Sequence, residues 1–262
     1  MPYGPTLLAA LAFTSTALSP PAAVAADSPT IAAAADLQFA LVEVANAFTR
    51  ATGRRVNLAF GSSGNFFRQI QQGAPFAMFF SADEQFVNDL AAAGLTADAG
   101  SLYAVGRIGI IVPHGSPLAA DRELADLRAA LADGRLTKFA IANPEHAPYG
   151  RRAEEALRHA GLWEAIAGKL VFGENATQAA QFATTGNTDG GIIAYSLALA
   201  PDVARLGSFA LIPQTWHAPL RQRMVLITGA GETAERFYAF MQEGTARAIM
   251  RRYGFVLPGE TM

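Results

Sequence analysis

Residues 56–84 read VNLAFGSSGNFFRQIQQGAPFAMFFSADE, and this stretch contains the repeating unit of the fold. Alternating apolar residues predict a strand over residues 56–60, and the turn Gly61-Ser62-Ser63-Gly64 follows it. Apolar residues then recur at helical spacing over residues 66–70, and residues 76–80 predict a buried strand. A strand, a turn, a helix and a second strand in this order are typical of an α/β protein with mainly parallel sheets.

The same alternation continues on both sides of this stretch. Residues 30–34 predict a strand, and Asp36 is placed to cap the helix that follows and that Gly53 ends. Ser81 and Glu84 have the spacing of a capping box for the next helix. Apolar runs predict further strands over residues 103–112, 138–142, 169–172, 190–194 and 223–228. Periodic segments predict further helices, including a helical tail over residues 232–252.

The chain suits one large domain or two modest lobes, and no low-complexity linker would join two lobes. The chain then has to cross between the lobes through strands, and residues 103–112 and 221–228 are the two predicted crossings. This places residues 27–106 and 223–262 in one lobe and residues 107–222 in the other.

Composition excludes several classes of protein. With 262 residues and 51% hydrophobic residues the chain can bury a large core, and its net charge of −2 with no basic run argues against nucleic acid as a partner. The sequence has no cysteine, which excludes disulfides, cysteine-ligated metal and a lipid-modified cysteine. Its four histidines show no metal-ligand spacing, so neither a resident metal nor a cofactor is expected.

The first residues resemble a secretion signal. Residues 6–18 are apolar, Pro20 and Pro21 end the run, and small residues precede Asp27. The apolar core is shorter than the roughly 20 residues that a membrane span requires. Residues 1–26 are therefore expected to be a signal peptide, and the mature chain is expected to be free in the periplasm without a lipid anchor.

The turn Gly61-Ser62-Ser63-Gly64 is a candidate anion site. It lies between a predicted strand and a predicted helix, where backbone N–H groups and the helix dipole favour negative charge without Lys or Arg. An ordinary turn with a serine cap explains the same residues. Three other segments have this strand-to-helix form, namely residues 34–37, 147–150 and 174–177. Such turns gather at the carboxyl ends of the strands in an open α/β sheet. Four helix N-termini could therefore converge on one anion.

Enzymatic alternatives have weaker support in the sequence. A secreted hydrolase could use Ser62 or Ser63, but the Gly-x-Ser-x-Gly elbow is absent and His146 is expected in a solvated loop. No nucleotide-binding motif is present either. A sensor domain with the same pocket but another partner also remains open.

The combined motifs resemble the periplasmic molybdate-binding proteins of ABC-type importers, which have the class II periplasmic-receptor fold. The resemblance runs from about residue 31 to residue 258, and the matching motifs are Gly61-Ser62-Ser63-Gly64 with Gln69-Ile70 and Gly73-Ala74-Pro75, Phe79-Phe80-Ser81-Ala82-Asp83, residues 142–150, and Gly173-Glu174-Asn175 with Gln178-Ala179. It implies a monomeric receptor that binds molybdate or tungstate, with molybdenum or tungsten present only as the oxyanion, and delivers it to a membrane permease.

The resemblance also implies the site residues. Ser63 would supply a hydroxyl and an amide, Tyr149 an amide and its hydroxyl, and Ala176 an amide, while the turn of Ala35 and Asp36 would supply amides and Ser62 would lie nearby.

The chain departs from the family at two of its positions. Many members have a Ser or Thr in the turn that here holds Ala35 and Asp36, and some have a Tyr where this chain has Ala194. Either Asp36 caps its own helix, or its carboxylate faces the ligand and selects a protonated anion such as hydrogen phosphate or arsenate. A receptor for another tetrahedral oxyanion, including sulfate, therefore remains the alternative.

Overall fold

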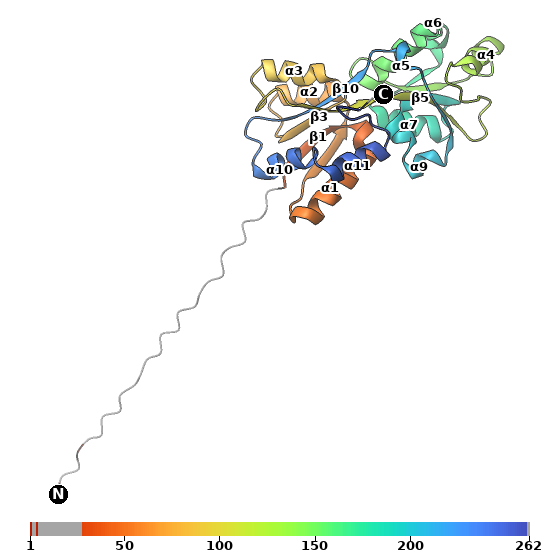
Figure 1. Ribbon diagram of the computed structural model, residues 1–262. Helices are drawn as coiled ribbons and strands as arrows, with labels where there is room; N and C mark the ends of the chain where they lie inside the picture. The colour runs from red at the N-terminus through yellow and green to blue at the C-terminus, as the bar shows by residue number, and fades with distance from the viewer. Residues whose placement is uncertain (2–3, 5–27, 261–262) are drawn as a thin grey trace.

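The computed structural model describes Met1, Gly4 and residues 28–260, and it shows two five-stranded sheets, each flanked by helices (Figure 1). The two-lobed class II receptor fold is thereby confirmed. The predicted signal peptide, residues 1–26, lies outside the described residues apart from Met1 and Gly4. Within the described part of the chain, no helix has the length and apolar character needed to cross a membrane.

The first sheet has the order β2-β1-β3-β10-β4. Strands β2, β1 and β3 are parallel, and β10 pairs antiparallel with both β3 and β4. The sheet is therefore mixed, with a parallel side and an antiparallel side. Its strands are β1 (Thr30–Ala34), β2 (Asn57–Gly61), β3 (Met78–Ser81), β4 (Ser101–Gly106) and β10 (Leu220–Leu226).

Helices cover both faces of the first sheet, as Figure 1 shows. On one face, Phe48 packs edge-to-face against Phe237 and Phe240 in the main core of this lobe. On the other face, Phe66 and Phe79 belong to a smaller buried cluster. The first face carries α1 (Gln38–Thr52), α10 (Glu232–Phe240) and α11 (Gly244–Arg252), and the second carries α2 (Ser63–Gln71) and α3 (Glu84–Ala92).

The second sheet repeats this arrangement with the order β7-β6-β8-β5-β9. Strands β7, β6 and β8 are parallel, whereas β5 pairs antiparallel with β8 and β9. The strands are β5 (Ile108–Pro113), β6 (Phe139–Ala142), β7 (Leu170–Gly173), β8 (Gly190–Ala194) and β9 (Gly207–Leu211). The surrounding helices are α4 (Ala125–Asp133), α5 (Pro148–His159), α6 (Trp163–Ile166), α7 (Ala176–Thr184), α8 (Tyr195–Ala198) and α9 (Pro201–Ala204).

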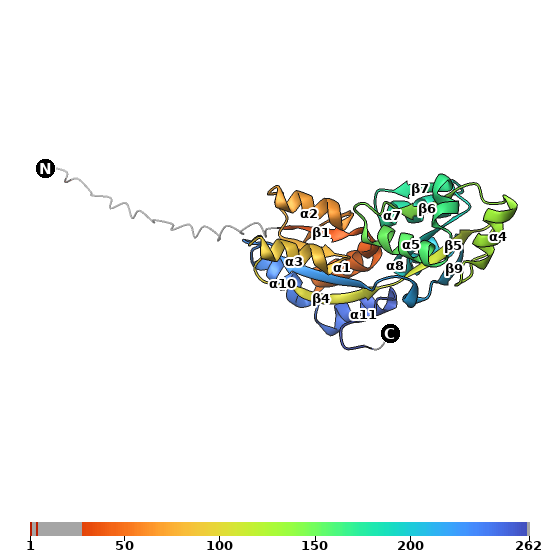
Figure 2. The same cartoon turned by 90° about the horizontal axis from the view of Figure 1, so that it is seen from above.

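The chain passes between the sheets at two places, and the outward one can be followed in Figure 2 where β4 leads into β5. The outward crossing is at Arg107, because β4 ends at Gly106 and β5 begins at Ile108. The run predicted as one strand over residues 103–112 is thus two strands in different sheets. The return strand β10 already pairs with the first sheet at Leu220, so the predicted division between residues 222 and 223 falls inside this strand.

Two predicted helix starts were wrong. Asp36 does not cap α1: a 3-10 turn, η1 (Ala35–Leu37), precedes that helix, and no side-chain cap forms at either start. Ser81 does not open α3 either, since Asp83 is the N-cap and accepts from the Gln85 amide at 3.0 Å. In both cases the polar side chain has a partner other than the helix end. The Ser81 hydroxyl bonds the backbone carbonyl and amide of Asp83.

Candidate functional site

Four helix N-termini meet at one small cavity. They belong to η1, α2, α5 and α7, and each follows the carboxyl end of a parallel strand, namely β1, β2, β6 and β7. Ligands bind at this end of open α/β sheets, where helix N-termini leave backbone N–H groups without partners. The cavity is lined by Ala34, Ala35, Asp36, Gly61, Ser62, Ser63, Ala82, Ala147, Pro148, Tyr149 and Ala176. The six residues singled out in the sequence are all among them.

Ser62 and Ser63 have different environments although they are adjacent. Ser62 is the N-cap of α2, and its Oγ accepts from the Asn65 amide at 3.3 Å. Ser63 is the first residue of the helix and only 1% exposed, and its Oγ accepts from the Ala82 amide at 3.0 Å. That bond uses the oxygen of Ser63 as acceptor and leaves the hydroxyl hydrogen to be donated. Ser63 can therefore offer both its hydroxyl and its amide to an anion in the cavity.

The α5 and α7 ends supply backbone donors from the second sheet. Pro148 is the first residue of α5, and Tyr149 follows it, so the Tyr149 amide lies in the first turn, where no intrahelical acceptor is available. Ala176 begins α7, and the Asn175 side chain caps this helix by accepting from the Gln178 amide at 3.0 Å, as the sequence spacing predicts. This cap satisfies the Gln178 amide of α7. The Ala176 amide, at the cavity, is left available to a ligand.

The η1 turn is held from the second lobe by two hydroxyl groups. The Thr177 hydroxyl donates to the Ala35 carbonyl at 2.9 Å, and the Ser196 hydroxyl donates to the Asp36 carbonyl at 2.8 Å. Ser196 follows Ala194 closely in the chain, and Ala194 itself is completely buried. The two bonds fix the η1 backbone across the interface between the lobes.

The Asp36 side chain belongs to a buried network rather than to a helix cap. The Tyr149 hydroxyl and Gln222 Nε2 each donate to Asp36 Oδ2 at 2.9 Å. Gln222 Nε2 also donates to the Tyr149 hydroxyl at 2.9 Å, while the Tyr103 hydroxyl donates to Gln222 Oε1 at 2.6 Å. Asp36 Oδ1 is buried and has no hydrogen-bond partner in any other described residue. The Tyr149 hydroxyl is thus committed to Asp36 and Gln222.

Burial changes the acid–base properties of this network. It raises the pKa of Asp36 to about 7, even though the hydrogen bonds from Gln222, from Tyr149 and from the backbone N–H of Asp36 itself act to lower it. Burial, together with the charge on Asp36, also raises the pKa of Tyr103 and of Tyr149 well above the ordinary value. Both tyrosines therefore keep their protons near neutral pH and act as donors.

Two glycines allow the lobes to approach this closely. A Cβ atom at Gly64 would lie 2.6 Å from the His146 carbonyl oxygen, which accepts from the Gly64 amide at 3.0 Å. A Cβ atom at Gly106 would lie 2.3 Å from the Tyr149 hydroxyl and 2.6 Å from Gln222 Nε2. Any larger residue at either position would displace a group that joins the two lobes.

His146 was expected in a solvated loop, and this prediction was wrong. The residue is only 8% exposed, and its Nδ1 lies 2.9 Å from Ser62 Oγ. Its Nε2 lies 3.2 Å from Glu174 Oε2, so the side chain joins the first lobe to the second. The contact was missed because a loop histidine carries no pattern that reveals a partner 84 positions away.

Sequence reasoning also missed Gln222 and Tyr103. The available signal was the alternation of β10, in which Leu220, Gln222 and Met224 face inward and are buried. A glutamine at an inward position of a strand needs a polar partner, because a buried amide without one is costly.

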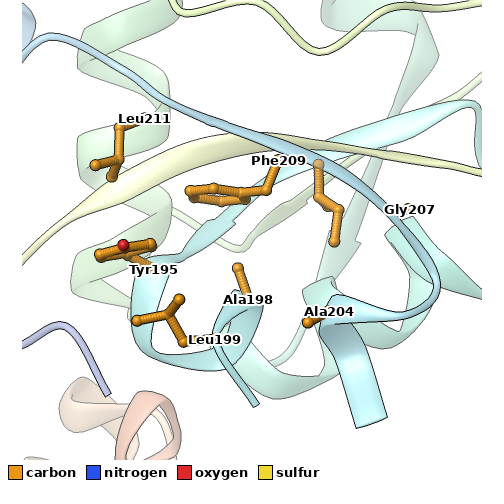
Figure 3. Close-up of a pocket in the computed structure, with 8 residues that line it drawn as sticks. Tyr195, Ala198, Leu199, Ala204, Gly207, Phe209 and Leu211 are labelled. Carbon is orange, nitrogen blue, oxygen red and sulfur yellow. The ribbon is translucent and has the colours of Figure 1, made fainter. Parts of the chain in front are cut away.

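A larger pocket lies elsewhere in the second lobe, beside α8 and β9 (Figure 3). Its volume is about 410 Å³, and the labelled side chains around it, such as Tyr195, Leu199 and Phe209, are predominantly apolar. It lacks the convergent helix ends of the smaller cavity. No group of acidic, histidine or cysteine residues in the described part of the chain could hold a metal ion.

Comparisons with known proteins agree on one family. The model of the bacterial extracellular solute-binding proteins matches residues 29–256. The molybdate-binding protein ModA of Rhodobacter capsulatus is 36% identical over 228 residues, covering 86% of each chain, and that of Azotobacter vinelandii is 34% identical over 231 residues, covering 87% of this chain and 89% of its own.

Solved structures give the same result. The periplasmic molybdate-binding protein of Azotobacter vinelandii superimposes with a TM-score of 0.80 at 29% identity, covering 88% of this chain and all of the other. The sulfate-binding protein SubI of Mycobacterium tuberculosis shares the fold, with a TM-score of 0.69 at 17% identity. The chain therefore belongs to the family of bacterial extracellular solute-binding proteins, with the ModA proteins among its relatives.

Proposed function

We propose that this protein is a periplasmic receptor that binds molybdate or tungstate between its two lobes and delivers it to an ABC-type importer. The observation that carries the proposal is the meeting of four helix N-termini at one cavity whose lining contains no Lys, Arg or His. Backbone amides and a serine hydroxyl can bind a fully ionised tetrahedral dianion by hydrogen bonds alone. The relatives named as molybdate-binding proteins support this choice of ligand.

The donors come from both lobes, which suits capture by closure. Ser63 and the η1 turn belong to the first sheet's lobe, while Tyr149 and Ala176 belong to the second. An anion held by all four contacts favours the closed state over the open one by the contacts that only the closed state makes. We infer that the importer recognises the closed form, that the receptor acts as a monomer, and that, having no cysteine, it is free of a lipid anchor.

A test of ligand choice is the thermal stability of the ligand-stripped protein with added oxyanions. A ligand at a thousandfold excess over its Kd stabilises the folded state by about 4 kcal/mol, which raises Tm by roughly 8–16 °C for a chain of this size. We expect this rise with molybdate and with tungstate. Sulfate is smaller and leaves the donors too far apart, so we expect no comparable rise with it.

A hydrolase is the second candidate, and the contact between Ser62 and His146 is the observation in its favour. Three features oppose it. Ser62 is only 4% exposed, its Oγ already caps α2 by accepting from Asn65, and opening of the lobes would separate it from His146. Turnover of a p-nitrophenyl ester or phosphate that Ser62→Ala abolishes would establish the enzyme; we expect none in either protein.

A further inference from the structure

Asp36 is the one residue with a formal charge among those that line the site cavity. The other ionisable residue there is Tyr149, which is neutral, and no cation faces the cavity from the lining residues. A dianion bound here would be balanced only by amide and hydroxyl dipoles. An ionised Asp36 would add a further negative charge beside it, and like charges at a buried site disfavour each other's ionised form.

The hydrogen bonds around Asp36 show which oxygen can carry a proton. Tyr103 donates to Gln222 Oε1, so the Gln222 amide presents its Nε2 to Asp36. Gln222 Nε2 and the Tyr149 hydroxyl both donate to Oδ2. Oδ2 therefore already faces two donor hydrogens, whereas Oδ1 is buried without a partner in another described residue. A proton on this carboxyl group belongs on Oδ1.

Few neighbouring groups can compete for that proton. Tyr149 of α5 and Tyr103 of β4 contact the network, and the pKa of each lies well above its ordinary value. Helix α8 contributes Ser196, which bonds the Asp36 carbonyl, and α7 contributes Thr177, which bonds the neighbouring Ala35 carbonyl. His146 contacts Ser62 and Glu174 rather than Asp36.

We propose that Asp36 is a proton-holding residue of the site: the closed form contains it as the neutral acid, so the protein takes up one proton together with each oxyanion dianion. This inference rests on the proposed function, because it requires a dianion in the cavity. The proton stays on the Asp36 carboxyl group, and no bond of the anion is broken. Burial already raises the pKa of Asp36 to about 7, and a neighbouring dianion raises it further.

Proton uptake makes affinity depend on pH. Between the pKa of Asp36 in the free protein and its higher pKa in the complex, affinity falls about tenfold for each unit of rising pH. Replacement by asparagine keeps the shape and supplies an N–H donor without a proton to gain or lose. Asp36→Asn should therefore bind the dianion with an affinity that changes little with pH.

The test is calorimetric titration with sodium molybdate at about pH 8 in two buffers of different ionisation enthalpy. We expect the native protein to take up about half a proton or more per molybdate, and Asp36→Asn to take up none. Asp202→Asn, which changes an exposed carboxylate on α9, is the matched control and should take up the same number as the native protein. His146→Gln should also retain the uptake.

Contrary outcomes are distinct from a failure of the proposed function. Tight molybdate binding without proton uptake in the native protein overturns the role of Asp36 and leaves the receptor intact. Proton uptake that disappears in His146→Gln but persists in Asp36→Asn assigns the proton to His146. That result also overturns the role of Asp36. Binding of phosphate by the native protein that Asp36→Asn loses would show a charged, proton-accepting Asp36. If neither the native protein nor any variant binds molybdate, the proposed function and this inference both fail.

Discussion

The Tyr149 hydroxyl at the start of α5 donates a hydrogen bond of 2.9 Å to the Asp36 carboxyl group in the η1 turn. The two residues are 113 positions apart and belong to different lobes. Their contact joins the lobes directly at the cavity. It also couples the closing of the site to the protonation of its one acidic side chain.

Removal of the Tyr149 hydroxyl should move the pH dependence of binding. Tyr149→Phe keeps the ring and the backbone amide but removes one donor to Asp36, which favours the neutral acid and raises its pKa. The midpoint of the decline in molybdate affinity should shift to higher pH, while affinity below the midpoint falls by about 0.5–1.5 kcal/mol for the lost interlobe bond. Calorimetric titration over a pH series measures both quantities. An unchanged midpoint would show that Tyr149 does not influence the protonation of Asp36.

Ser63→Ala should weaken oxyanion binding. The hydroxyl hydrogen of Ser63 is free to be donated, and a hydrogen bond to a charged group contributes about 1.5–3 kcal/mol, or roughly 10- to 150-fold in Kd. Ser208→Ala on the exposed side of β9 is the control. Calorimetry gives the affinity of each variant. Equal values for the two variants would show that the Ser63 hydroxyl does not contact the ligand.

Gly64→Ala should hinder closure without unfolding the first lobe. The added Cβ would lie 2.6 Å from the His146 carbonyl oxygen, across the lobe interface, and overpacking of this kind costs about 1–3 kcal/mol. We expect a loss of affinity of roughly 5- to 150-fold and a smaller ligand-induced decrease in the radius of gyration by X-ray scattering. Gly168→Ala adds a methyl group in open space and should behave as the native protein does in both measurements.

The ligand-free protein should also show the cost of burying Asp36. Its folded pKa of about 7 lies above the ordinary 3.8, so the unfolded chain ionises first and native stability decreases as pH rises from about 4 to 7. Asp36→Asn lacks this loss. Relative to the native protein its free energy of unfolding should increase by about 1–4 kcal/mol across this window and level off above it. Denaturant unfolding at about pH 5 and pH 8 compares the two, and a constant difference would mean that the carboxyl group is hydrated in the free state.

Two of the helix starts at the cavity could be predicted from the sequence because helix N-termini follow local rules. Asn175 and Gln178 have the spacing of a cap, and the Asn175 side chain does accept from the Gln178 amide. Residues 61–64 likewise have the glycines and serines that a strand-to-helix turn needs, and α2 begins within them, at Ser63. The positions of these ends along the chain can be read without knowing the rest of the fold.

Side-chain partners that are distant in sequence could not be predicted in this way. Asp36 has the local pattern of an N-cap, yet Tyr149 and Gln222 compete successfully for its carboxyl group because the fold brings them to it. His146 is similar, since its burial depends on Ser62 and Glu174. The break of one predicted strand at Arg107 also depends on tertiary structure, because both halves are apolar and only the two sheets separate them.

The most direct test of the receptor assignment is isothermal titration of the ligand-stripped protein with molybdate, tungstate, sulfate and phosphate near neutral pH. The receptor assignment predicts submicromolar binding of molybdate and tungstate with one site per chain, and no heat of binding from sulfate or phosphate. Tight binding of phosphate with none of molybdate would contradict it, and would make Asp36 the residue that selects a protonated anion.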